Sequence, residues 1–575
     1  MDQRRVLLAF LLMAAVLAGS QWWYSTQAPP PVPAGSSDTT AVAAAPSSGP
    51  PPSAPPDSLA AVDSTPAAAG PSDANVLLGG RPAPAAVLVE TPLYRALIDP
   101  VGGGLRQIEL LNYRSFTDSG PVALVPRGGA FLNRTAELGQ GRVAFEELTF
   151  APGVPSIRLA EGDSAATLVL RHQAGGREIV QSYRFTSADY LIDYTLALDA
   201  SQSGVLVTGL GPRLESNEKK PREDYAQLRA VVRLDGEVLT HQAKDVDEGA
   251  AVSLAGDVGW AGLRNKYFLA MILPPVGGPA LSGVTIGGEP NDSLPRLEVA
   301  VGAPIQQGRG GYRLYFGPQE YRRLQSVNAG LDGVNQYGWS WIRWMITPFA
   351  KGIVLVMLWL HQWIPSYGLV LIVFAVLIRL ILWPLTTKSF RSIQAMQQLQ
   401  PEIQRLREQH KRDPQKMQQE TMRLYRERKV NPLGGCLPNL IPLPVLFALF
   451  FVFQGTIELR NQPFLWLPDL SQPDPIYILP VLMGLTMLIS SKMTATDPKM
   501  AAMTYIMPIV LTFVFLNLAS GLVLYYAVSN VLTFAQQWWL KRGTTLPPAE
   551  PAGPQLVTSG KPARPGKSGK PNKKA

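Results

Sequence analysis

Cysteine and histidine are scarce in this chain of 575 residues. Cys436 is the single cysteine, so the chain forms no internal disulfide and contains no CxxC pair or cysteine-based zinc cluster. None of the four histidines, His172, His241, His361 and His410, lies at metal-ligand spacing from another. The sequence therefore predicts no zinc or haem site, and no cofactor.

Carboxylates are missing from the most apolar part of the chain. Between residues 368 and 540, Arg379 is the one Lys, Arg, Asp or Glu well inside an apolar stretch. An ion-coupled transporter would normally carry Asp or Glu within its helices. An intramembrane protease would need paired Asp, HExxH or a serine-based pair, and none of these is recognisable. Arg379 is therefore predicted to lack a partner within the protein, which leaves water or an incoming acidic group.

The apolar stretch at residues 366–386 predicts a transmembrane helix around Arg379. An arginine at that depth costs about 2.5–3.5 kcal/mol on insertion scales. One interpretation is a functional charge in a hydrophilic groove. The other is an arginine that snorkels towards the headgroups near Lys388, roughly 13 Å further along the helix at ~1.5 Å per residue. The missing carboxylate favours the first interpretation.

The net charge of +9 is unevenly distributed along the chain. Residues 387–432 hold eleven Lys and Arg against five Asp and Glu, and residues 541–575 hold eight against one. Hydrophobic residues make up 46% of the chain and gather after residue 340. Because basic segments beside apolar helices mark the cytoplasmic side, we expect a membrane protein with both termini in the cytoplasm.

The N-terminal half predicts an anchor, a linker and a β-domain. Residues 1–24 join a basic start to an apolar run with aromatic residues at its end, which indicates a transmembrane anchor; a cleaved signal peptide is the alternative. Residues 25–85 are rich in Pro, Ala, Ser and Gly and predict a disordered linker. Short alternating segments in residues 86–328 predict a large antiparallel, all-β sandwich with a structural or partner-binding role.

The C-terminal half predicts an α-helical membrane region. Tryptophan-rich residues 329–365 indicate an amphipathic helix in the membrane interface. Residues 387–432 predict a cytoplasmic helical hairpin whose second helix begins at the Asp413-Pro414 pair. With the anchor, six transmembrane helices are predicted: 1–24, 366–386, 433–453, 476–491, 500–518 and 519–540. A periplasmic loop at 454–475, a cytoplasmic loop at 492–499 and a basic cytoplasmic tail at 541–575 complete the chain.

Polar side chains on the predicted spans are candidates for the lining of a groove, although ordinary interhelical hydrogen bonding would use the same residues. The groove candidates are Arg379, Asn439, Gln454, Thr512, Asn517, Tyr525, Tyr526, Ser529 and Asn530. Basic residues of the hairpin and tail are candidates for contact with the anionic membrane surface or ribosomal RNA. These are Arg405, Arg407, Lys411, Arg412, Lys541, Arg542, Lys573 and Lys574.

Several motifs, in order along the chain, resemble the YidC/Oxa family of membrane-protein insertases. The similar motifs are Trp260-Ala261-Gly262 with Asn265-Lys266-Tyr267-Phe268, Ile378-Arg379 with Trp383-Pro384-Leu385-Thr386, the run from Lys429 to Pro438, Asp474-Pro475, and the run from Ser520 to Tyr526 with Ser529-Asn530. The resemblance covers residues 86–542, and the large domain after the first span is similar to the Gram-negative form of the family.

The resemblance implies a five-helix core around a hydrophilic groove in the inner membrane of a Gram-negative bacterium. Arg379 would draw the polar or acidic segment of a nascent protein into the bilayer, and the β-domain would be a periplasmic supersandwich. The implied partners are nascent membrane proteins, the ribosome, the Sec translocon and the lipid bilayer, with no small-molecule substrate and no enzymatic chemistry. Pro442 stands where many members carry a groove glutamine, and Asn439, one turn earlier, could supply an amide instead.

Two other functions stay open. A cell-envelope protein that processes carbohydrate or assists assembly would use the β-domain as its active module and the helices as an anchor. A small-solute transporter is the second alternative, and the lack of a carboxylate in the predicted spans argues against it.

Overall fold

The computed structural model describes two compact units, a β-domain that ends at Gln336 and also includes Gly455–Glu458, and a helical unit made of Tyr337–Gln454 and the chain from Leu459 onwards. The described residues are 85–126, 131–139, 141–199, 201–246, 250–291, 294–327, 329–338, 341–410, 413–428, 430, 443–494 and 501–543. The predicted anchor at 1–24 and nearly all of the predicted linker at 25–85 lie outside them. So do Asn439, Pro442, Lys411, Arg412, Lys573 and Lys574.

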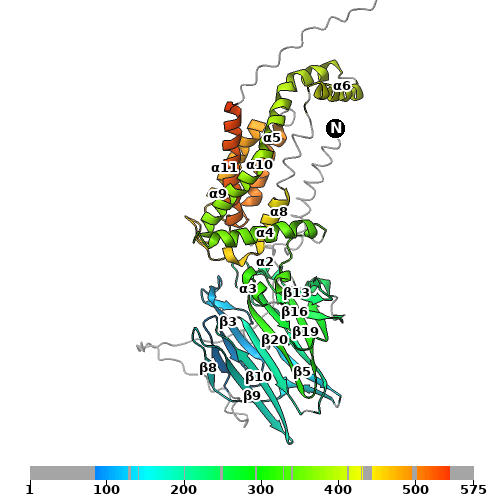
Figure 1. The fold of residues 1–575 in the computed structure, drawn as a ribbon, viewed down its shortest axis with the longest axis vertical. Helices are drawn as coiled ribbons and strands as arrows, with labels where there is room; N and C mark the ends of the chain where they lie inside the picture. The colour runs from blue at the N-terminus through cyan, green and yellow to red at the C-terminus, as the bar shows by residue number, and fades with distance from the viewer. Residues whose placement is uncertain are drawn as a thin grey trace, which may run out of the picture. The chain divides into compact units, whose positions relative to one another are not determined.

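Three sheets build the described part of the β-domain (Figure 1). The five-stranded sheet has the order β4 (Pro121–Ala123), β3 (Leu105–Arg114), β2 (Tyr94–Ile98), β1 (Val87–Glu90) and β8 (Ser156–Arg158). The nine-stranded sheet has the order β14 (Glu237–His241), β13 (Arg229–Leu234), β16 (Val258–Arg264), β17 (Phe268–Leu273), β20 (Arg309–Pro318), β11 (Leu191–Ala197), β10 (Arg177–Phe185), β9 (Ala166–Ala174) and β7 (Ala151–Pro152). The six-stranded sheet has the order β15 (Ala251–Leu254), β18 (Gly283–Glu289), β19 (Arg296–Ile305), β12 (Gly204–Leu210), β5 (Asn133–Leu138) and β6 (Gly141–Ala144).

Strand pairing in the β-domain is antiparallel, as predicted, except where β1 pairs parallel with β8. Alternation of buried and exposed side chains, as along Tyr94–Ile98, shows that such strands turn one face to the core. The central strand β17 is buried on both faces, and all of its residues are apolar. Short helices connect some of the strands: η1 (Phe145–Glu147), α2 (Pro221–Tyr225) and η2 (Ala243–Asp245). Two more, α3 (Tyr321–Ser326) and η3 (Leu331–Val334), follow the last strand.

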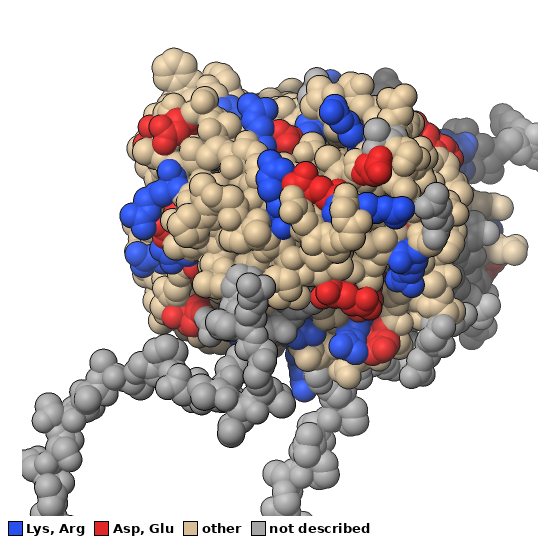
Figure 2. Space-filling model, turned by 90° about the horizontal axis from the view of Figure 1, so that it is seen from below, with Lys and Arg blue, Asp and Glu red and all other residues tan. Residues whose placement is uncertain are grey.

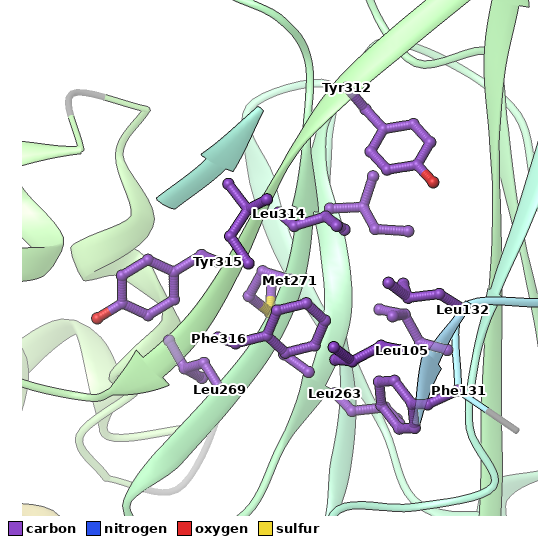
Figure 3. Packing of buried hydrophobic residues seen from close by; sticks show 14 of the residues in the cluster. Leu105, Phe131, Leu132, Leu263, Leu269, Met271, Tyr312, Leu314, Tyr315 and Phe316 are labelled. Carbon is purple, nitrogen blue, oxygen red and sulfur yellow. The ribbon is translucent and has the colours of Figure 1, made fainter. Parts of the chain in front are cut away.

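The core of the β-domain packs side chains from strands far apart in sequence. In Figure 3, Leu105 and Phe131 lie beside Leu263, and Phe316 lies beside Met271. The rings of Phe131 and Phe316 meet edge to face, with centroids 6.0 Å apart. One hydrophobic cluster therefore joins the sheets of the domain.

Asn265 builds the turn between β16 and β17. Its Oδ1 accepts hydrogen bonds from the backbone N–H groups of Tyr267 and Phe268, at 3.2 and 2.8 Å. Nearby, a Cβ at Gly262 would collide with the backbone carbonyl of Ala270. The glycine and asparagine of this sequence motif therefore have a structural role in the domain core.

One face of the β-domain is seen in Figure 2, where Lys and Arg alternate with Asp and Glu. This face therefore presents mixed charge and no extended field of one sign that would favour nucleic acid or an anionic membrane.

The helical unit begins with α4 and continues through helices of different lengths. Its described helices are α4 (Arg343–His361), α5 (Tyr367–Gln409), α6 (Pro414–Glu427), α8 (Leu443–Gly455), η4 (Ile457–Leu459, which starts in the β-domain segment), α9 (Ile478–Thr494), α10 (Ala501–Phe515) and α11 (Ser520–Gly543). By length and composition, α4 and α5 could each cross a membrane, and α8, α9 and α10 contain shorter apolar helices. The predicted number of spans stays a prediction.

Helix α5 differs from the predicted division at residue 386. It runs unbroken for 43 residues, so the apolar segment with Arg379 and the first arm of the hairpin form one helix. Helix α6 begins as predicted at Pro414, and the Asp413 side chain accepts a hydrogen bond from the backbone N–H of Lys416 at 3.0 Å. An ion pair of 2.8 Å between Arg428 and Glu402 ties the end of α6 back to α5.

Helix α4 covers Arg343–His361 of the tryptophan-rich segment 329–365. Its buried side chains recur every three or four residues along one face, and large aromatic residues lie on the exposed face. The exposed tryptophans in and beside α4 are Trp341, Trp344, Trp359 and Trp363. This division agrees with the predicted amphipathic character, although the length of α4 also allows a span.

Helices α5 and α11 pack side by side and run parallel (Figure 1). Leu371 lies opposite Gly521, and the ring of Phe374 packs against Tyr525 with centroids 6.0 Å apart. Further along, Trp383 lies against Trp539 at 6.1 Å. Helix α11 also packs against α9, which in turn packs against α10.

Candidate functional site

Arg379 lies on α5 at the contact with α11. Its side chain is partly buried, and Nη2 donates a hydrogen bond of 2.5 Å to Oε1 of Gln536 on α11. Its Nε is buried and has no hydrogen-bond partner among the described residues. No ion pair with a described carboxylate reaches Arg379 within 4.0 Å. The charge is therefore held by a neutral amide and keeps a free donor.

Gln536 is almost fully buried, with 2% of its surface exposed. Its Nε2 donates to Oγ1 of Thr387 at 3.0 Å and to the backbone oxygen of Trp383 at 3.4 Å. Oγ1 of Thr386 lies within hydrogen-bond distance of both amide atoms, at 3.1 and 3.2 Å. Both threonine hydroxyls also donate to backbone carbonyls of the preceding turn of α5. One amide thus links Arg379 to the following turns of the same helix.

Tyr525 is the predicted residue that the structure brings closest to this charge. It is buried against Phe374 and lies near enough to Arg379 to interact with it electrostatically. Its hydroxyl also bonds to Ser529, one turn further along α11. The ring of Tyr526 turns to the other side and packs edge to face on Phe515, 4.9 Å away.

The other described groove candidates occupy separate places. Oγ1 of Thr512 donates to the carbonyl of Pro508 in its own helix, and the Thr512 side chain faces Gly484 of α9. Gln454 is the second-last residue of α8, and Asn517 is exposed just after the end of α10. Asn530 is partly buried on α11, one residue after Ser529. The structure therefore groups Arg379 with Tyr525 and Ser529, and the roles of the remaining candidates stay predictions.

The expectation that Arg379 has no partner within the protein is wrong, because Gln536 accepts from its guanidinium. Sequence analysis also missed Thr386 and Thr387, which hold the amide. A signal was present in the chain, since Gln536 and Gln537 form a pair of amides inside an otherwise apolar predicted span.

The described basic candidates lie at the ends of helices. Arg405 and Arg407 are in the last turns of α5, and Lys541 and Arg542 are in the last turn of α11. The Arg542 guanidinium lies over the ring of Trp538, 3.6 Å from its centroid. Their contact with a ribosome or a membrane surface stays a prediction.

Another arginine, Arg134, is buried in the core of the β-domain and was not predicted. Its Nε donates to the Tyr312 hydroxyl at 2.7 Å, and Nη1 donates to the Gly103 carbonyl and to Oε1 of Gln181, both at 3.1 Å. Its Nη2 donates to the Tyr183 hydroxyl. Burial alone lowers the pKa of Arg134, but the surrounding tyrosines outweigh it and raise that pKa. Its polar groups are satisfied, so it stabilises the core and offers no free donor to a ligand.

No group of three or more His, Cys, Asp or Glu in the described residues could hold a metal ion. The site in the helical unit is therefore a cluster of one cation, amides, hydroxyls and aromatic rings. Such a cluster can attract and orient an acidic or polar group, and it contains no activated nucleophile with a base beside it.

Comparison with known proteins covers both units. The family model of the YidC periplasmic domain matches residues 86–351, and that of the 60Kd inner membrane protein matches residues 359–546. A membrane protein insertase YidC from Syntrophus aciditrophicus is 33% identical over 487 residues, covering 79% of this chain and 85% of the relative. The chain belongs to the YidC family of membrane protein insertases.

A further relative agrees with this assignment. A membrane protein insertase YidC from Cupriavidus metallidurans is 34% identical over 508 residues, covering 84% of this chain and 87% of the relative. The crystal structure of an active YidC insertase covers 79% of this chain and 92% of its own, at 18% identity and a TM-score of 0.35. The predicted family and fold class are confirmed: a large β-sandwich periplasmic domain joined to an α-helical membrane region.

Proposed function

We propose that this chain inserts nascent membrane proteins into the lipid bilayer and assists their folding, with Arg379 as the charge that attracts them. The observation that carries the proposal is a partly buried guanidinium with a neutral partner and an unpaired buried Nε. An uncompensated cation in a low-dielectric setting interacts strongly with an approaching anion. Membership of a family of membrane protein insertases supports the assignment.

In the proposed mechanism, the acidic or polar segment of a nascent protein leaves the cytoplasm for the neighbourhood of Arg379. The hydroxyls of Tyr525 and Ser529 and the amide of Gln536 offer hydrogen bonds that replace part of the segment's hydration. The apolar helix of the substrate then moves into lipid along the predicted third and fifth spans. Each step is binding and transfer, so we infer that the chain performs no covalent chemistry.

The finer assignments belong to the same proposal. We infer an inner-membrane location with the β-domain in the periplasm and both termini in the cytoplasm, supported by the basic residues of the hairpin and tail. These basic segments would contact the ribosome, and the chain would act alone or with the Sec translocon. The carbohydrate-processing alternative is not favoured, because the family matches extend over the β-domain and the helical unit alike.

Replacement of Arg379 tests this function. In proteoliposomes that contain the full chain alone, Arg379→Ala and Arg379→Glu should reduce insertion of a test protein with an acidic translocated segment at least tenfold. Arg379→Lys should retain most of the activity, because a point charge suffices to attract an anion. Arg391→Ala is the matched control, since it removes an exposed cation from the same helix at a residue outside the predicted sites.

Normal insertion by the Ala and Glu variants, together with loss of function when the β-domain is deleted, would contradict the insertase assignment. Flux of a small solute through the same proteoliposomes would support a transporter instead. Insertion and solute flux are measured in the same vesicles. A difference in the amount of reconstituted protein therefore affects both measurements alike.

A further inference from the structure

The amide of Gln536 occupies the position at Arg379 where an acidic group would bind. Its Oε1 accepts from the guanidinium at 2.5 Å, within a side chain that is 2% exposed. An amide oxygen accepts a hydrogen bond with nearly the same geometry as a carboxylate oxygen, but it carries no charge. The resting contact therefore imitates a salt bridge without neutralising the cation.

The orientation of this amide is determined by its other contacts. Nε2 donates to the Thr387 hydroxyl at 3.0 Å, and that hydroxyl donates in turn to the Trp383 carbonyl at 2.8 Å. A second contact from Nε2 reaches the Trp383 carbonyl itself. Because Nε2 can only donate and Oε1 can only accept, these contacts direct Oε1 towards Arg379.

We propose that Gln536 is a positioning residue that holds the Arg379 guanidinium in place of a substrate carboxylate and gives way to that carboxylate on binding. The proposal rests on the proposed function. A hydrogen bond in which both groups are charged is shorter and stronger than one to a neutral amide, so an incoming carboxylate displaces Oε1. When a carboxylate displaces Oε1, Nε2 keeps its contacts with Thr386 and Thr387. The amide nitrogen therefore needs no new acceptor.

The neighbouring residue, Gln537, provides a matched control. It lies on the same helix and is also buried, at 8% exposure, but its Oε1 accepts from the Ser490 hydroxyl of α9 at 2.9 Å. Gln537→Glu therefore adds the same charge one residue away, at a contact that does not involve Arg379.

The test compares two single-span substrates in proteoliposomes that contain the full chain. One substrate has a single Asp in its translocated segment, and the other has Asn at that position. Wild type should insert the Asp substrate several-fold better than the Asn substrate. In Gln536→Glu this ratio should fall to about one, because a permanent internal pair neutralises Arg379. Gln537→Glu should keep the wild-type ratio.

Gln536→Met separates positioning from general structure. It removes the acceptor without adding a charge, so insertion of both substrates should fall while the preference for Asp remains. The proposal is overturned if the Met and Glu variants lose the preference equally, since Gln536 would then act through packing. It is also overturned if Gln537→Glu loses the preference, since any added charge would then have the same effect.

The wild-type result distinguishes this proposal from the function on which it rests. If wild type inserts both substrates equally well, the surrogate role of Gln536 is refuted and insertase activity stands. If wild type inserts neither substrate, the proposed function itself fails. Elution of each variant as a single species in size-exclusion chromatography checks that the helical unit is intact.

Discussion

Two arginines, the partly buried Arg379 in the helical unit and the buried Arg134 in the β-domain, are held by neutral groups. Arg134 donates from Nε, Nη1 and Nη2, and its guanidinium also lies 4.2 Å from the centroid of the Tyr194 ring. Arg379 makes one such bond to Gln536 and leaves Nε free. The same residue type is therefore structural where its donors are satisfied and available for binding where they are not.

Replacement of Arg134 should destabilise the β-domain. Arg134→Met removes the four hydrogen bonds that the guanidinium donates to Tyr312, Gly103, Gln181 and Tyr183, and each such bond contributes roughly 0.5–1.5 kcal/mol. We expect the free energy of unfolding of the domain to fall by about 2–4 kcal/mol. Limited proteolysis of the full chain across a urea series, with fragments identified by mass spectrometry, measures the change.

Arg171→Met is the control for that measurement. Arg171 is 56% exposed and pairs with Glu178 at the surface, so its replacement should change stability by less than about 1 kcal/mol. Equal destabilisation by both substitutions would show that the hydrogen bonds of Arg134 do not contribute specifically to the stability of the β-domain.

Single residues also mark the limit of prediction from the sequence. The apolar helix around Arg379 follows from hydropathy alone. The contact with Gln536 does not, because it depends on how α5 and α11 are rotated and which residues face each other. Hydrophobic periodicity defines the faces of one helix, but it leaves the register between two helices undetermined.

At the scale of elements, strands and helix starts were the most predictable features. The start of α6 follows from the Asp413-Pro414 pair. Near the start of α9, Oδ2 of Asp474 accepts a hydrogen bond from the backbone N–H of Leu479 at 2.8 Å. The continuous α5 was not predicted, because Pro384 usually ends or kinks a helix. The carbonyl of Trp383, just before that proline, accepts from the Thr387 hydroxyl and from Gln536.

Gly484 allows α9 and α10 to approach each other. A Cβ at this position would collide with Oγ1 of Thr512, so Gly484→Ala should destabilise the helix pair by about 1–3 kcal/mol. Addition of Thr512→Ala removes the colliding hydroxyl and should recover most of the loss. Thermal unfolding of the full chain in detergent measures both effects.

Gly352→Ala is the matched control for a glycine in a helix. Nothing lies within 4 Å of a Cβ built on Gly352, so this substitution should leave the melting temperature unchanged or raise it slightly. A decrease as large as that of Gly484→Ala, or failure of Thr512→Ala to restore stability, would contradict a steric role for Gly484.

At the scale of the whole molecule, some sequence motifs stabilise the fold and others form the candidate site. Asn265 and Gly262 shape a turn in the β-domain, whereas Arg379, Tyr525 and Ser529 meet in the helical unit. Family membership and fold class were therefore predictable from motifs in their order along the chain. The number of spans and the orientation of the chain remain predictions, since only α4 and α5 are long and apolar enough by themselves among the described helices.

The basic tail should contribute to ribosome binding through its charge. Removal of residues 551–575, which hold six of the Lys and Arg of the tail, should weaken co-sedimentation with ribosomes at low salt. The difference should disappear at high salt, where the charges are screened. A control that replaces this segment with an uncharged linker of equal length separates charge from length. Unchanged co-sedimentation at low salt would show that the tail is only a solvated run of charge.

The unbroken course of α5 has a mechanical consequence. Its 43 residues form a rod of about 65 Å at ~1.5 Å per residue, with Arg379 near one end and the hairpin arm at the other. A force on the hairpin arm would therefore be transmitted along α5 to Arg379. Rotation of α5 about its axis would move the guanidinium away from or towards Gln536. Binding at Arg379 and movements of the hairpin arm would then act on the same helix.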